Sequence, residues 1–270
     1  MHATEKGTAC YAMVIDLDKC TGCGACMVAC AVENNCAVPP PEAADNRGLT
    51  WMRVQRTDNG RDWPEHRAVA VPIPCQQCEH APCIHVCPVT AVQLDENTGI
   101  VGQVPQRCMG CRYCMAACPY HARYFNWWDP KWPEGMEQTL NPDVSPRMRG
   151  VAEKCNFCHG RLDRAREQAA AEGRPADEAV EYVPACVEAC PHGAITFGNR
   201  QAEGSPVAEL VKRPEAFRLL AALGTEPKVT YLSRDPWVRR VGLSRLDMVR
   251  GQGDNRSGDN RTGGNGPEGA

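Results

Sequence analysis

The chain has 270 residues and a formal net charge of −3. So small a net charge excludes the global positive field that attracts nucleic acid, and we expect no nucleic-acid partner. Aromatic residues make up only 6% of the chain while cysteine occurs 18 times, so something besides apolar packing is expected to stabilise the fold.

The N-terminal stretch MHATEKGTACYAMVIDLDKC has neither the apolar core of a secretory signal nor a twin arginine. No window approaches the roughly 18 consecutive apolar residues of a membrane span, so the sequence predicts no transmembrane helix. If the protein works at a membrane or beyond one, we expect a partner to supply the anchoring or the export.

Secondary structure is predicted mainly as short elements. Apolar stretches predict strands at 12–17, 91–95, 100–104, 194–198 and 228–232. The three residues before the last cysteine of each compact cysteine run predict the first turn of a short helix, at 27–29, 84–86 and 115–117.

The remaining stretches are of three kinds. Residues 206–223 are predicted to form two helical pieces, because Pro206 suits a first turn and Pro214 would restart the helix. The Pro- and Gly-rich stretches 37–48 and 126–150 predict loops. From Gly251 onward the chain has almost no apolar residue, which predicts a disordered tail over 251–270.

Sixteen of the 18 cysteines fall into four groups that form an internal repeat. Three groups end in Cys-Pro followed by an alanine (CPVTAV, CPYHAR and CPHGAI), whereas the first has Ala31 in place of the proline. In chain order the groups are Cys20, Cys23, Cys26 and Cys30; Cys75, Cys78, Cys83 and Cys87; Cys108, Cys111, Cys114 and Cys118; and Cys155, Cys158, Cys186 and Cys190.

This spacing is typical of cubic iron–sulfur clusters. Three thiols in C-x2-C-x2-C wrap one corner of a cluster, and the fourth, before proline, ligates the other cluster of a pair in bacterial ferredoxins. Four groups therefore predict four [4Fe–4S] clusters. Because each would be fully ligated, we expect one-electron transfer and no direct small-molecule substrate.

Other readings of the cysteines explain less. A zinc ribbon accounts well for the pairs Cys155/Cys158 and Cys186/Cys190 in isolation, but poorly for the compact runs. Disulfides are disfavoured, because cysteines three apart rarely bridge well. The chain has no G-x-G-x-x-G after a strand, no P-loop and no G-x-S-x-G, so nucleotide-dependent and hydrolase chemistry lacks support.

Several residues near the groups have open roles. Basic residues precede three groups and would raise the cluster potentials unless they are solvated: Lys19, Arg107 and Lys154. Histidines beside the groups could tune potentials or take protons, although loop positions explain them more simply: His121, His159 and His192. Three tryptophans suggest an interface or loop packing: Trp127, Trp128 and Trp132. Cys10 and Cys36 lie outside the repeat and are interpreted as ordinary partly buried thiols.

The segments YAMVIDLDKCTGCGACMVACAVEN, CQQCEHAPCIHVCPVTAV, CMGCRYCMAACPYHARYFN and EKCNFCHGRLDRAR…PACVEACPHGAITFG resemble the electron-transfer subunit of the dimethyl sulfoxide reductase superfamily. The likeness covers about residues 10–235 with all sixteen cysteines in register. It implies an α+β fold of two interleaved bacterial ferredoxin-like 2×[4Fe–4S] modules with long loop insertions.

The resemblance also implies which cysteines share a cluster. Cluster 1 would be held by Cys20, Cys23, Cys26 and Cys190, and cluster 2 by Cys30, Cys155, Cys158 and Cys186. Cluster 3 would be held by Cys75, Cys78, Cys83 and Cys118, and cluster 4 by Cys87, Cys108, Cys111 and Cys114. The first module would combine residues 10–36 with 150–235, the second would span 70–125, and 37–69 and 126–149 would be interface loops.

By the same resemblance, the partners are a molybdopterin catalytic subunit with molybdenum or tungsten and an integral membrane subunit that reacts with quinone. The chain itself would be a non-catalytic, peripheral subunit, either at the cytoplasmic face or exported together with a signal-bearing catalytic partner. The alternatives are an electron-transfer subunit of a hydrogenase or formate dehydrogenase, a free ferredoxin-like carrier, and a zinc-binding structural module.

Overall fold

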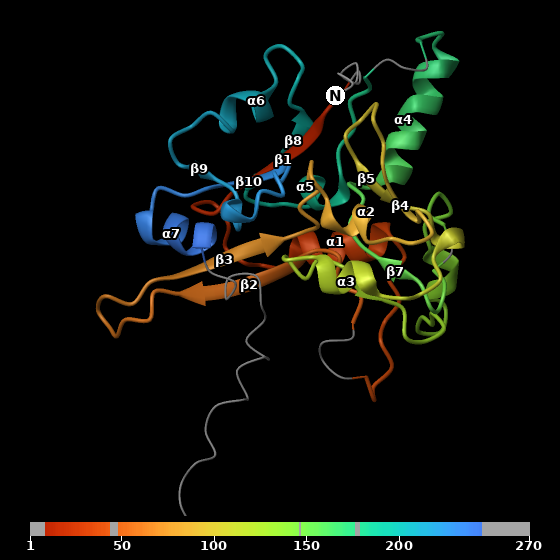
Figure 1. Ribbon diagram of the computed structural model, residues 1–270, viewed down its shortest axis with the longest axis horizontal. Helices are drawn as coiled ribbons and strands as arrows, with labels where there is room; N and C mark the ends of the chain where they lie inside the picture. Colours follow the sequence, from red (N-terminus) through yellow and green to blue (C-terminus); the bar gives the residue numbers. More distant parts are fainter. Residues whose placement is uncertain (1–8, 44–47, 146, 176–178, 245–270) are drawn as a thin grey trace, which may run out of the picture.

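The computed structural model describes residues 9–43, 48–145, 147–175 and 179–244 (Figure 1). The tail predicted to be disordered, 251–270, lies outside these residues.

The largest sheet has the strand order β8-β1-β10-β9. Its members are β1 (Tyr11–Asp16), β8 (Ile195–Asn199), β9 (Ala216–Phe217) and β10 (Val229–Leu232). Strand β1 runs parallel to β10 and antiparallel to β8, so the start of the chain pairs with two segments from its last third. The YAMVID run suits this central place because both of its faces are buried, Met13 and Ile15 in the main core and Ala12 and Val14 in a smaller cluster under α6 (Pro206–Leu210).

The structure confirms the strands predicted at 12–17, 194–198 and 228–232. It also confirms the hairpin around the ENTG turn, as β4 (Val92–Leu94) paired with β5 (Val101–Gln103). The second helical piece predicted after Pro214 is wrong. Strand β9 forms there instead, because Phe217 pairs with Tyr231 of β10 and is buried, and a 3-10 turn follows at Ala221–Leu223.

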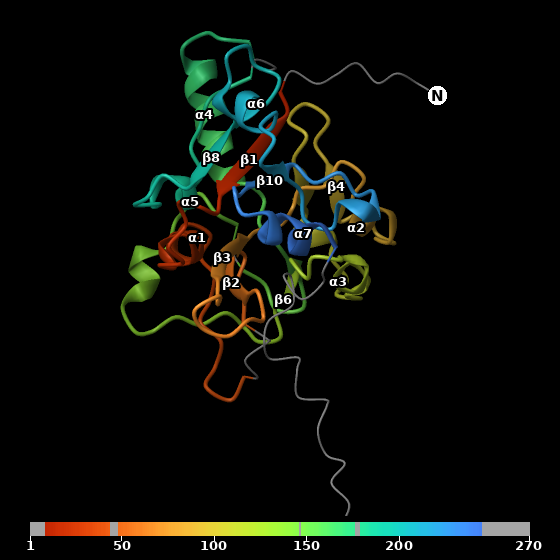
Figure 2. The same cartoon turned by 90° about the vertical axis from the view of Figure 1, so that its left-hand side faces the viewer.

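Four short helices lie beside the cysteines. They are α1 (Ala25–Glu33), α2 (Pro82–His85), α3 (Tyr113–Ala117) and α5 (Ala185–Glu188). Helix α1 packs against α5, and α2 packs against α3. Figure 2 shows these two pairs on opposite sides of the molecule.

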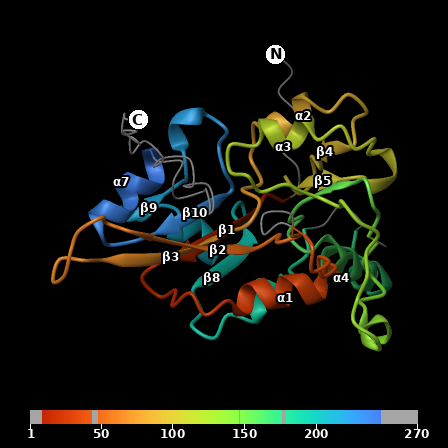
Figure 3. The same ribbon diagram turned by 90° about the horizontal axis from the view of Figure 1, so that it is seen from below.

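Two further hairpins shape the molecule. Strands β2 (Arg53–Asp58) and β3 (Ala68–Ile73) form an antiparallel hairpin that the sequence did not predict, and its loop extends toward α7 (Pro236–Ser244) in Figures 1 and 3. The expected loop at 126–150 is closed at its base by β6 (Tyr124–Phe125) and β7 (Ala152–Glu153), and it contains a 3-10 turn at Met136–Thr139. Another 3-10 turn spans Pro105–Arg107, and helix α4 (His159–Ala171) follows the first half of the last cysteine group. Every helix within the described ranges is too short or too polar to span a lipid bilayer.

Candidate metal centres

Four thiols line one cavity beside α1. The first quartet consists of Cys20, Cys23, Cys26 and Cys190. Three of them come from the loop before α1 and its first turn, and Cys190 follows α5. The pairing of β1 with β8 brings these distant segments together, since each strand adjoins one of the two cysteine segments.

A second cavity is lined by the four thiols of the third quartet, Cys75, Cys78, Cys83 and Cys118. Cys83 is on α2 and Cys118 follows α3, so the packing of α2 on α3 joins the two segments. The same cavity is lined by the cationic side chains of Arg123 and Lys154.

The second quartet comprises Cys30, Cys155, Cys158 and Cys186, all buried. Burial raises the pKa of the Cys30 thiol, and the neighbouring charges of Cys155, Cys36, Cys158 and Cys186 raise it further. Helix α1 serves two quartets, because Cys26 and Cys30 lie four residues apart on one helix face.

In the fourth quartet, the structure places Cys108, Cys111 and Cys114 together. Burial raises the pKa of Cys114, and the charges of Cys108 and Cys111 add to the rise. Cys87 is the predicted fourth member. Like Cys114, it lies close enough to Arg123 for the charge of that arginine to lower its pKa. Cys111 is exposed, so this quartet lies nearer the surface than the second.

The Cys-Pro-x-x-Ala repeat forms a turn that aims a backbone amide at the cysteine sulfur. The amide of Ala91 donates to Cys87 Sγ at 3.2 Å, and that of Ala194 donates to Cys190 Sγ at 3.3 Å. Ala122 donates to Cys118 in the same way. The residue before each alanine has positive φ, 49° at Thr90, 48° at His121 and 55° at Gly193. The sequence revealed the recurring alanine but not its role, which is to stabilise negative charge on the sulfur.

The first group lacks the proline and achieves the same contact differently. With Ala31 after Cys30, helix α1 continues, and the amide of Asn34 is used in the helix, donating to Cys30 O at 3.2 Å. The side chain of Asn34 takes over, since its Nδ2 donates to Cys30 Sγ at 3.7 Å. Asn34 also hydrogen-bonds the thiol of Cys158. Sequence reasoning missed this residue, although it occupies the same position, four after the cysteine, as the three alanines.

The donor set fits a cluster of several irons. Burial raises the pKa of Cys26 to about 11 and that of Cys155 to about 12, with neighbouring thiols adding to both. Such thiols release their protons only to a strongly positive centre, which bound iron supplies. Among the described residues, no three His, Cys, Asp or Glu side chains are grouped as a single metal ion requires. The first and third quartets instead line cavities, and in each of the four quartets an amide donor is directed at one sulfur, which suits [4Fe–4S] ligation.

The three basic residues singled out in the sequence differ in burial. Lys154 is buried and donates from Nζ to the carbonyl oxygens of Val101 and Cys155, the latter at 3.0 Å. Lys19 is exposed and lies 3.8 Å from Asp16, and Arg107 is exposed as well.

The histidines, tryptophans and remaining cysteines lie at the edges of the site. His121 and His192 are exposed, and His159 Nδ1 lies 2.8 Å from Asp163. The tryptophans Trp127, Trp128 and Trp132 are all half-buried, and the ring of Trp127 packs against Phe125. Cys10 is buried and Cys36 half-buried.

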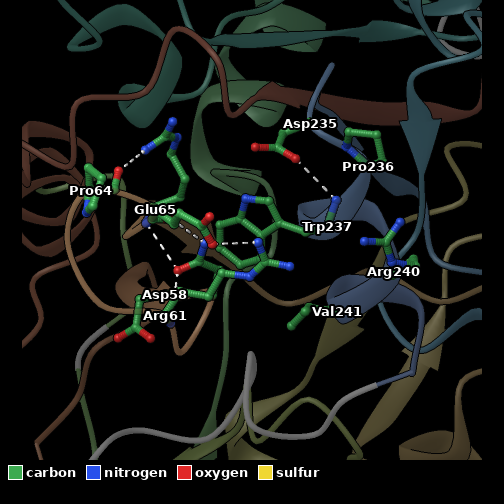
Figure 4. A pocket seen from close by; sticks show the side chains of 11 residues that line it. Asp58, Arg61, Pro64, Glu65, Asp235, Pro236, Trp237, Arg240 and Val241 are labelled. Carbon is green, nitrogen blue, oxygen red and sulfur yellow. Dashed lines mark hydrogen bonds and ion pairs between the residues drawn. The ribbon is translucent and has the colours of Figure 1, made fainter.

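One groove on the surface is separate from the thiols. It has a volume of about 710 Å³ and lies between the β2–β3 loop and the start of α7. Figure 4 shows Arg61 and Glu65 of the loop facing Asp235 and Trp237 across it. No cysteine lines the groove, so it is not part of the metal site.

Taken together, the short paired helices, the thiol quartets and the sulfur-directed amides define a ferredoxin-like iron–sulfur protein. Comparison with known families agrees. Residues 67–134 match a 4Fe-4S dicluster domain, and residues 11–32 match a 4Fe-4S binding domain.

Full-length relatives identify the family. The chain is 55% identical over 246 residues to the menaquinone reductase iron–sulfur cluster-binding subunit of Nitratidesulfovibrio vulgaris, covering 90% of this chain and 96% of that protein. It is 37% identical to the Hdr-like menaquinol oxidoreductase iron–sulfur subunit 1 of Archaeoglobus fulgidus, covering 82% of each. It is 34% identical to the arsenate respiratory reductase iron–sulfur subunit of a Shewanella species, covering 82% of this chain and 94% of that one.

The chain therefore belongs to the iron–sulfur electron-transfer subunits of the dimethyl sulfoxide reductase superfamily, as the sequence motifs predicted, and it binds [4Fe–4S] clusters.

Proposed function

We propose that the chain relays single electrons through four [4Fe–4S] clusters, one in each quartet, between a catalytic subunit and a quinone-reactive membrane subunit. Along this path the electron would pass the cluster of the first quartet, then those of the second, third and fourth, or the reverse. The protein supplies the ligands, the spacing and the electrostatic environment, while each bound cluster accepts and releases one electron.

The observation that carries this proposal is that neighbouring quartets adjoin through their thiols. Cys186 of the second quartet lies close to Cys26 of the first. Burial raises the pKa of Cys186, and the nearby charge of Cys26 raises it further. Cys155 of the second quartet stands in the same relation to Cys75 of the third. In addition, Gln77, between Cys75 and Cys78, donates to Cys155 O at 2.8 Å.

The third and fourth quartets adjoin in the same way. Burial raises the pKa of Cys83, and the nearby charge of Cys114 adds to it. With the two contacts above, this makes a continuous series of neighbours from the loop before α1 to the surface near α3. A series of this kind suits electron relay and has no use in a zinc-binding structural module.

The structure supports, in addition, two interleaved ferredoxin-like modules. Residues 10–36 and 150–235 share the main sheet through β1 and β8 and share a helix pair, α1 with α5. Residues 70–125 contain the other pair, α2 with α3. We assign residues 37–69 and 126–149 to contacts with partner subunits.

The relatives support the choice of partners. Two of them are named for menaquinone or menaquinol, and others for arsenate and selenate reduction. We propose a large partner of the molybdopterin oxidoreductase superfamily, a membrane partner that reacts with menaquinone, and no substrate chemistry on this chain. The chain would be peripheral, held at the membrane by these partners.

Native purification of the tagged full chain from its own membranes tests this proposal. We expect brown protein with four clusters per chain, together with a large subunit of that superfamily, its molybdenum or tungsten, and a membrane subunit. Nickel in the purified complex would instead favour the hydrogenase alternative. The proposal would be refuted in favour of a free carrier by two results together. The brown protein, expressed at its native level, would be a monomer, and it would transfer no electrons to menaquinone when its own membranes are added.

The crossed pairing of ligands is tested by Cys30→Ser. We expect damage to the cluster shared with Cys155, while the cluster shared with Cys20 keeps its electron paramagnetic resonance (EPR) signal. Cys36→Ser is the matched control, because Cys36 is a thiol close to Cys30 and Cys158 but is assigned to no cluster. Loss of the Cys20 cluster in Cys30→Ser would show that the pairing is wrong.

A further inference from the structure

Arg123 is a buried cation whose position lies between two quartets. It directly follows Ala122, the residue whose amide is directed at Cys118, and only 3% of its surface is exposed. Its side chain lines the cavity of the third quartet. Full burial of an arginine is rare unless its charge is balanced, so the groups around it indicate what balances it.

The neighbours of Arg123 are thiols of both the third and the fourth quartets. Burial lowers its pKa, but the charges of Cys83, Cys114, Cys75 and Cys118 outweigh burial and raise it. Cys83, Cys75 and Cys118 belong to the third quartet, whereas Cys114 belongs to the fourth. Cys87, also of the fourth quartet, faces the same guanidinium.

No other group balances this charge. Its Nη2 donates to Gln103 Oε1, a neutral amide, and the buried guanidinium also hydrogen-bonds the Cys114 thiol of the fourth quartet. Within the described residues, the charges that act most on Arg123 come from these thiols and not from a carboxylate. A buried arginine whose partners are a neutral amide and a cysteine of the site, with no carboxylate, is suited to an anion between the quartets. The protein alone does not provide that anion, and negatively charged clusters would.

We propose that Arg123 is a positioning residue shared by the third and fourth quartets, where its fixed charge raises the reduction potentials of both clusters together. This inference rests on the function proposed above. Reduction adds one negative charge to a cluster, and a nearby cation in a poorly polarisable interior favours the more negative state. Because one guanidinium faces both quartets, the two potentials should move together.

Arg123→Gln in the complete complex, followed by an EPR-monitored redox titration, tests the proposal. We expect two of the four midpoint potentials to fall by at least about 59 mV each. For a one-electron couple this corresponds to a tenfold decrease in the equilibrium constant for reduction. Arg123→Lys keeps the charge and should keep both potentials near the wild-type values. Arg107→Gln is the matched control, since this exposed arginine precedes Cys108, and we expect no shift.

A second variant decides the matter if Arg123→Gln does not assemble its clusters. Gln103→Glu changes one atom of the partner of Nη2 and introduces a carboxylate that neutralises the guanidinium in place. We expect the same two potentials to fall with all clusters present. The proposal is wrong if intact clusters show unchanged potentials in Gln103→Glu, or if only one potential moves in either variant. A wild-type complex with fewer than four clusters would instead contradict the proposed function. The effect of Arg123 would then still be tested on the potentials of the clusters that are present.

Discussion

Replacing Asn34 with leucine should lower the potential of the cluster held by the second quartet. The substitution keeps a buried side chain of similar size but removes the Nδ2 donor that lies 3.7 Å from Cys30 Sγ and 2.9 Å from Cys30 O. The carbonyl is not left unpaired, because it still accepts the backbone amide of residue 34 at 3.2 Å. The main loss is therefore at sulfur.

The size of the effect follows from the contact. Hydrogen bonds to charged groups contribute about 1.5–3 kcal/mol, and the length of this one indicates the lower end. Sulfur carries more negative charge in the reduced cluster, so roughly half of that value, about 0.7 kcal/mol, should distinguish the two redox states. At 59 mV for about 1.4 kcal/mol in a one-electron couple, we expect a fall of about 30 mV.

An EPR-monitored redox titration of the intact complex measures this fall. Asn34→Asp is the informative companion, because it removes the same donor and adds a negative charge beside Cys30 and Cys158, so its fall should be larger. Unchanged potentials in both variants, with all clusters present, would refute the assignment of Asn34 as a donor to cluster sulfur. A shift in the cluster of the first quartet alone would refute it equally.

Three predictions concern the backbone and the core. Thr90→Gly should stabilise the holoprotein by up to about 1 kcal/mol, seen as a higher urea midpoint, because a β-branched residue at φ 49° is strained. Gly110→Ala should cost more than about 2 kcal/mol and lower the iron content, because its Cβ would lie 2.6 Å from Gly150 O; full iron content would contradict this. Ile15→Ala, at a fully buried position, should cost about 2–5 kcal/mol in urea unfolding, whereas Val28→Ala, at a position 65% exposed, should change little.

The cysteine spacing predicted most of the site because ligation constrains sequence locally. Three thiols at C-x2-C-x2-C can surround one corner of a cluster whatever the rest of the fold does, so four such runs were readable without a structure. The strands next to them were predictable for a related reason. A run such as YAMVID is apolar on both faces, and only a central strand buries both.

Elements fixed by distant partners were not predictable. Strand β9 has only two residues and exists because Phe217 pairs with Tyr231 of β10, which overrides the helical pattern after Pro214. In the β2–β3 hairpin, the sequence of β2, RVQRTD, is mostly charged and polar and by itself indicates a loop. It forms a strand because it pairs with β3, whose Val71 and Ile73 are buried. In both cases the deciding contact lies outside the local pattern.

The same distinction separates the cations that matter from those that do not. Lys19, Arg107 and Lys154 look equivalent in the sequence, each one residue before a cysteine group. The effect of a charge on a cluster depends on the medium between them, and a pair at fixed distance interacts about four times more strongly at an effective dielectric constant near 20 than in water. Lys19 and Arg107 are solvated, whereas Lys154 is buried where the second quartet meets the third. Arg123 is at the corresponding place between the third and fourth quartets, although it lies five residues beyond the nearest cysteine. Burial between quartets, which arises only when the α2–α3 pair and β7 assemble, therefore determines which cations act on the clusters.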